Sequence, residues 1–72
     1  MKTVAIVVRN PARADEALRA AVGQTLRGAR VVVVPLVPLP EGRALRTLRA
    51  LGCAVDAGLA ELRACHAVEV WS

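Results

Sequence analysis

Residues 2–36, KTVAIVVRNPARADEALRAAVGQTLRGARVVVVPL, have the pattern of one strand–helix–strand unit. The apolar run Val4–Val8 predicts a strand. Asn10 and Pro11 then predict the start of a helix, because Asn is a favourable N-cap and proline suits the first helical position. Apolar residues recur at helical spacing until Gly28, which predicts the end of the helix. The apolar run that closes the stretch has no polar alternation, as in a strand covered on both faces. The unit therefore predicts an α/β fold.

The second half of the chain continues this alternation after the extended, proline-rich connection VPLVPLPEG. Four further elements are predicted, in chain order: a helix at about 41–51, a strand at 53–55, a helix from the N-cap Asp56 to about Ala64, and a strand at 67–71. With right-handed crossovers, the order β-α-β-α-β-α-β predicts a three-layer sandwich with a mainly parallel sheet of about four strands. We expect one domain over residues 1–72.

The composition is strongly apolar for so short a chain. Hydrophobic residues make up 56% of the 72 residues, although a chain of this size buries only roughly 60% of its unfolded surface. The surplus predicts a patch covered by a partner subunit, identical or related, and so a homo-oligomer or an assembly of related chains. No apolar run approaches a membrane span and no signal peptide is apparent, so we expect a cytoplasmic protein without membrane contact.

The formal net charge is +4, and nine of the ten basic residues are arginines. A positive net charge favours nucleic-acid binding, but the chain has no aromatic platform and no RNA-binding motif. Arg43, Arg46 and Arg49 share the outer face of the helix at 41–51. They form either a solvated helix face or a contact surface for RNA or an acidic partner.

In open α/β sheets, ligands bind beyond the carboxyl ends of the strands. The predicted rim consists of Arg9 and Asn10 after the first strand, residues 35–40 after the second, and Asp56–Gly58 after the third. Arg9 beside a helix N-terminus is either a solvated arginine or the holder of a small anion. The rim lacks the glycine patterns of dinucleotide and Walker-type sites, so we expect no nucleotide cofactor.

The remaining reactive residues are Cys53, Cys65 and His66. Two cysteines and one histidine at this spacing do not make a zinc signature, so no metal is expected. Both cysteines should lie at the amino end of the sheet, opposite the ligand rim. They are either small buried thiols or sulfur-carrying or redox-active groups, and a disulfide between them is geometrically possible. Trp71 either packs at the sheet edge or anchors a subunit interface.

Two stretches of the chain resemble DsrE/DsrF/DsrH-like proteins, the small α/β subunits that include the TusB, TusC and TusD group. The first is VAIVVRNPARADEALRAAVGQTLRGARVVVV, and the second runs from Cys53-Ala54-Val55-Asp56 through Leu59-Ala60-Glu61-Leu62 to Val68-Glu69-Val70-Trp71. The region between the second strand and Cys53 is shorter than in that family. The resemblance implies a subunit of a sulfur-relay assembly that serves tRNA thiolation or sulfur oxidation.

The family's reactive cysteine follows a strand near the start of a helix. The comparable positions here are Asp56, Ala57 and Gly58, and none is cysteine. The resemblance therefore implies a subunit without its own persulfide site, in which Cys53 or Cys65 is the remaining candidate sulfur acceptor. The alternatives are a noncatalytic, oligomeric protein-interaction module and a basic accessory protein that contacts RNA. The sequence favours a nonenzymatic role over an enzymatic one.

Overall fold

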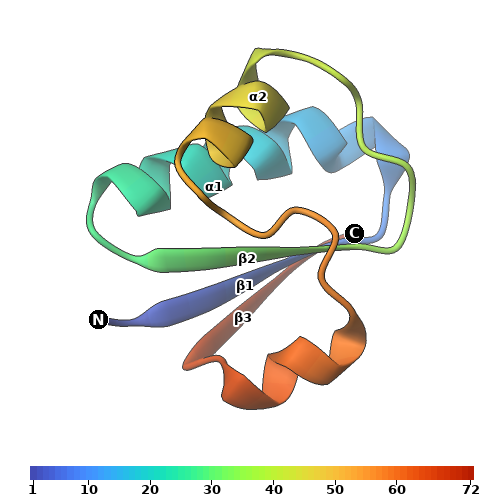
Figure 1. The fold of residues 1–72 in the computed structure, drawn as a ribbon. Helices are drawn as coiled ribbons and strands as arrows, with labels where there is room; N and C mark the ends of the chain where they lie inside the picture. The colour runs from blue at the N-terminus through green and yellow to red at the C-terminus, as the bar shows by residue number, and fades with distance from the viewer.

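A computed structural model describes all of residues 1–72, which form a three-stranded parallel sheet with helices. The elements in chain order are β1 (Thr3–Val8), the 3-10 helix η1 (Pro11–Arg13), α1 (Ala14–Leu26), β2 (Arg30–Pro35), α2 (Arg43–Ala50), the 3-10 helix η2 (Leu59–Ala64) and β3 (Ala67–Trp71). The strand order is β2-β1-β3. The helices α1 and α2 lie on one side of the sheet and η2 lies on the other (Figure 1).

The central strand β1 is buried on both faces, as its uniform apolar run predicts. Val4 is in register with Val31 of β2 and with Ala67 of β3. The main core lies between the sheet and the two α-helices, where Ile6 is fully buried. The other members of this cluster are Val4, Val8, Ala14, Ala17, Leu18, Ala21, Val31, Val33, Leu45 and Leu48. The first half of the chain thus folds around one apolar strand.

Local signals set the two ends of the first helical segment. The Asn10 side chain accepts a hydrogen bond from the Ala12 N–H at 3.0 Å, and Pro11 opens η1, which leads directly into α1. Gly28 follows the end of α1 with φ at +96°, a left-handed conformation that favours glycine. The predicted N-cap and helix stop are therefore both observed.

The predicted strand at 53–55 differs from the structure. Only Ala54 pairs with the sheet, through a single parallel bridge to Val32. The Val33 N–H donates to the Ala54 carbonyl at 2.8 Å, and the Ala57 N–H donates to the Val33 carbonyl at 3.0 Å. This segment covers the outer edge of β2 but is too short to form a fourth strand.

The third helix also begins later than predicted. Asp56 is not its N-cap: η2 starts at Leu59, after an extended Gly58 that provides no side-chain cap. The reason is the hydrogen bond that holds the Ala57 N–H against β2, because it keeps the chain out of a helical path until Gly58. The chain therefore contains three strands, and its last helical segment is a short 3-10 helix.

Candidate functional site

The predicted ligand rim at the carboxyl end of the sheet does not form one cavity. Arg9 is exposed, and its backbone N–H donates to the Trp71 carbonyl at 2.9 Å. The side-chain oxygen of Asn10 is engaged in capping η1. Asp56 lies beyond the outer edge of β2, where it lines a separate cleft of about 370 Å³. Residues of the predicted 35–40 segment line the same cleft, so the structure brings this segment and Asp56 together and leaves Arg9 and Asn10 outside the cleft.

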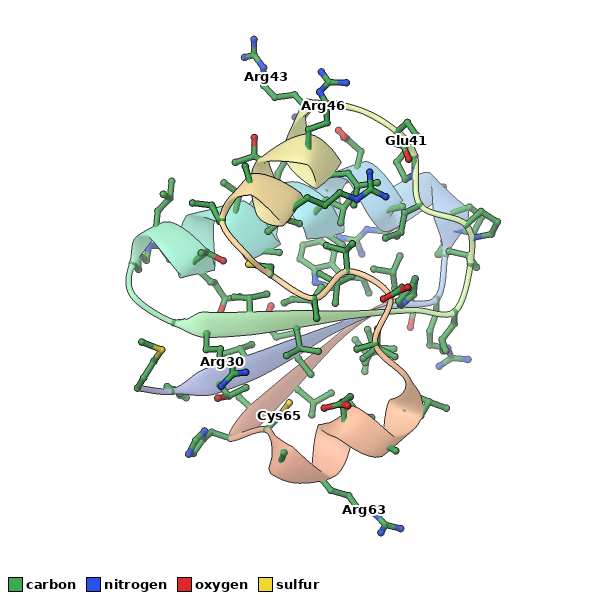
Figure 2. The ribbon with its side chains drawn as sticks, in the orientation of Figure 1. Arg30, Glu41, Arg43, Arg46, Arg63 and Cys65 are labelled. Carbon is green, nitrogen blue, oxygen red and sulfur yellow. The ribbon has the colours of Figure 1, made fainter.

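The three arginines of α2 are all exposed, but they differ in pairing. Arg49 lies 3.3 Å from the Glu41 carboxylate and forms an ion pair with it. Arg43 and Arg46 make no ion pair, and their side chains extend from α2 away from the sheet (Figure 2). Two of the three predicted contact residues are thus free cations on one helix face.

Trp71 is half-buried and packs against the main core at the end of β3. The guanidinium of Arg13 lies over its indole ring, 4.8 Å from the ring centroid. Sequence reasoning did not single out Arg13, because only the parallel pairing of β1 with β3 brings residues so distant in the chain together. Much of the Trp71 ring is therefore engaged within its own chain.

Both cysteines are free and half-buried, and they lie on opposite sides of the sheet. The Cys53 sulfur is 3.5 Å from the Thr25 hydroxyl, on the α1 side. The Cys65 thiol donates to the Glu61 carbonyl at 3.3 Å, on the η2 side (Figure 2). Neither sulfur lies at the carboxyl end of the sheet, where the ligand rim was expected.

The two cysteines are also far apart. Ala54, next to Cys53, pairs with β2 at one edge of the sheet, whereas Cys65 leads into β3 at the other edge. Three strand spacings of about 4.8 Å separate these edges, or roughly 14 Å. A disulfide needs Cα atoms within about 7 Å, so this fold excludes an intramolecular disulfide.

His66 does not activate the neighbouring cysteine. Its Nδ1 accepts a hydrogen bond from the Thr3 N–H at 3.0 Å, and its own backbone N–H donates to the Thr3 carbonyl at 2.8 Å. These two bonds tie the start of β3 to the start of β1. No hydrogen bond joins the imidazole to the Cys65 thiol, and the bonds that the structure gives His66 are the two to Thr3.

The outer edge of β3 is the most exposed apolar feature of the sheet. Val68 is 46% exposed and Val70 is 53% exposed, although both lie within a strand. Glu69 and Trp71 contact residues of the α1 segment, so the two valines face the η2 side. Leu59 of η2 is 56% exposed on that side as well. The surplus of apolar residues therefore includes an exposed group at one edge of the sheet.

The backbone of this edge is unpaired. The Trp71 carbonyl accepts from Arg9 beyond β1, so Trp71 directs its backbone polar groups toward β1. Because these groups alternate along a strand, those of Val68 and Val70 point away from β1. The opposite edge of the sheet is covered by the segment around Ala54. The sheet therefore has one open edge, and sequence patterning missed it because edge position depends on strand order.

No group of three or more His, Cys, Asp or Glu side chains is arranged to hold a metal ion. None of the helices combines the length and the apolar composition that crossing a bilayer requires. No protein-family model, no curated protein and no solved structure matches the chain. The resemblance to the DsrE-like group therefore stays a prediction from the sequence.

Proposed function

We propose that this protein is a noncatalytic assembly subunit that works by associating with other protein chains, identical or related. The observation that carries the proposal is the open outer edge of β3, where half-exposed valines accompany unpaired backbone groups. An uncovered apolar edge is a template for pairing with another chain, and monomeric proteins normally blunt such edges with lysine, proline or a bulge. The strand AVEVW has no lysine, proline or bulge, and the side chain of its one charged residue, Glu69, is hydrogen-bonded to Gln24 on the α1 side.

The positions of the cysteines support a noncatalytic role. A sulfur carrier needs an accessible thiol in a setting that favours the thiolate, such as a helix N-terminus or a neighbouring cation. Cys65 follows the end of η2 and donates to a carbonyl, and Cys53 is half-buried beside a hydroxyl. Neither cysteine lies at the N-terminus of a helix. We propose that the chain is a cytoplasmic partner subunit of a DsrE-like sulfur-relay assembly and does not itself carry the persulfide.

Two measurements test this function. After incubation with a polysulfide donor, mass spectrometry should find no added sulfur on Cys53 or Cys65 of the folded protein. Sedimentation velocity should show self-association that rises with concentration in the micromolar range. A persulfide on either cysteine would contradict the noncatalytic assignment, and a monomer at every concentration would contradict assembly through identical chains.

A matched pair of variants locates the associating surface. Val70→Lys places a charge at the open edge and should weaken self-association roughly tenfold or more, because an ammonium group would replace an apolar side chain within the contact. Leu26→Lys alters a side chain that is 72% exposed at the end of α1, away from β3, and should leave association unchanged. Equal effects of the two variants would show that general surface charge, not the β3 edge, controls association.

A second function is favoured by the unpaired cations of α2. We propose that Arg43 and Arg46 contact a phosphate backbone or an acidic partner, since both extend into solvent without a carboxylate partner. Binding of a mixed-sequence single-stranded RNA should weaken steeply with salt, and Arg43→Ala and Arg46→Ala should each reduce that salt dependence. Arg49→Ala is the matched control, because Glu41 already pairs with Arg49. RNA binding that is absent, or that is insensitive to both substitutions, would remove this function.

A further inference from the structure

The open edge of β3 has the geometry to pair with one specific kind of partner, and this inference rests on the assembly function proposed above. Val68 and Val70 combine outward backbone groups with half-exposed side chains on the η2 side. We propose that a second copy of this chain binds along β3 in the antiparallel direction, so that the two three-stranded sheets form one six-stranded sheet about a two-fold axis.

The number of open edges favours a second copy related by two-fold symmetry. Head-to-tail pairing would require a second free edge on each chain, but the outer edge of β2 is covered: Val33 bonds both Ala54 and Ala57 there, and Pro35 has no N–H to offer. A two-fold contact uses the same surface on both copies and closes at two chains. The single open edge therefore predicts a closed dimer and not a fibre.

The hydrogen-bond pattern also fixes the register. Only residues with outward backbone groups can exchange hydrogen bonds across the new contact. Val68 and Val70 must therefore lie opposite Val68 or Val70 of the second copy. Full overlap of Ala67–Trp71 with its copy is reached when Val68 lies opposite Val70 of the second copy. This register places Glu69 opposite Glu69 of the second copy on the two-fold axis.

The facing glutamates are the least favourable contact of this dimer. Like charges directly opposite one another destabilise a sheet. Each Glu69, however, accepts a hydrogen bond from the Gln24 side chain at 2.8 Å and lines a groove of about 570 Å³ along α1 that also contains Arg19 and Arg27. Arg19 is paired with Asp15 at 2.8 Å, so each groove offers one uncommitted cation, Arg27, for its Glu69, and this reduces the repulsion without removing it.

A disulfide placed on the axis tests the register. In the antiparallel arrangement, the two Glu69 positions form a non-hydrogen-bonded pair with Cα atoms about 4.5 Å apart, within the range that a disulfide spans. In a chain whose own cysteines are replaced (Cys53→Ser, Cys65→Ser), Glu69→Cys should give a covalent dimer under mild oxidation. Leu26→Cys in the same background is the control and should remain monomeric on a non-reducing gel.

A second variant keeps the test independent of the cysteine background. Glu69→Gln removes the facing charges and should raise the association constant roughly 2- to 5-fold. Suppose that the wild type self-associates, that Glu69→Cys cross-links no faster than Leu26→Cys, and that Glu69→Gln leaves association unchanged. The proposed β3 pairing is then wrong, but the assembly function stands. If wild type sediments as a monomer at every concentration, both are wrong.

Discussion

The guanidinium of Arg13 lies over the indole ring of Trp71, 4.8 Å from the ring centroid, and so joins the start of the first helical segment to the end of the last strand. Arg13 precedes α1, and Trp71 closes β3 beside the core. The contact fastens the edge strand on the α1 side of the sheet. Trp71 is the only Phe, Tyr or Trp residue of the chain.

Removing this contact should loosen β3. Arg13→Ala is expected to lower the free energy of unfolding by about 0.5–1 kcal/mol, the range for a partly exposed cation over an aromatic ring. Urea denaturation measures the loss. Glu16→Gln is the matched control, because it removes the 3.5 Å ion pair of Arg13 and leaves the stacking in place. Exposed ion pairs contribute little to stability, so Glu16→Gln should change the free energy of unfolding only slightly. An equal loss in both variants would instead assign the effect to the ion pair.

The cap at Asn10 gives a second prediction. Asn10→Ala leaves the Ala12 N–H without its 3.0 Å partner and should cost about 1 kcal/mol of unfolding free energy. Asn10→Asp keeps an acceptor at the same position and should retain most of the stability. An Asn10→Ala protein as stable as wild type in thermal and urea unfolding would show that the cap is not required.

Replacing each of two glycines by alanine should change the stability of the protein in opposite directions. Gly28→Ala forces a side chain into a left-handed backbone conformation, φ +96°, and should destabilise by about 1–2 kcal/mol. Gly23 lies inside α1, and a Cβ there would meet no atom within 4 Å. Gly23→Ala should therefore stabilise the protein by up to about 1 kcal/mol through helix propensity. The same sign for both substitutions, measured by urea unfolding, would contradict the described end of α1.

The cysteines should stay unlinked within one chain. Because roughly 14 Å of sheet separates the Cys53 and Cys65 positions, oxidation of the dilute folded protein should not produce the intramolecular disulfide. Intact-mass spectrometry after alkylation distinguishes two free thiols from a bridged pair. A bridged monomer formed under native conditions would mean that the two edges of the sheet approach each other far more closely than described.

The first strand, helix and second strand are predictable from the sequence because local signals define each of them. Each of these signals affects only residues near it in the sequence. They are the N-cap Asn10, the helix stop at Gly28 and the uniform apolar run of β1. The late start of η2 is different. It depends on the hydrogen bond between Ala57 and Val33, which forms only after the chain has returned to β2.

The candidate site was less predictable for the same reason. Which strand lies at an edge, and whether that edge is covered, follows from strand order and not from the pattern of one strand. Val68 and Val70 alternate with Ala67, Glu69 and Trp71 as in any half-buried strand, and only the order β2-β1-β3 leaves them at an open edge. The Arg13–Trp71 contact likewise requires β1 and β3 to be neighbours.

The central claim is that chains associate through the outer edge of β3, and amide hydrogen exchange of Val68 and Val70 tests it most directly. Their N–H groups point to solvent in a single chain and would be hydrogen-bonded in the dimer. Exchange of both amides, followed by NMR, should slow as the protein concentration rises, while the Ile6 amide in the central strand stays protected throughout. Fast exchange at Val68 and Val70 at every concentration, in a protein that sediments as a dimer, would contradict the account.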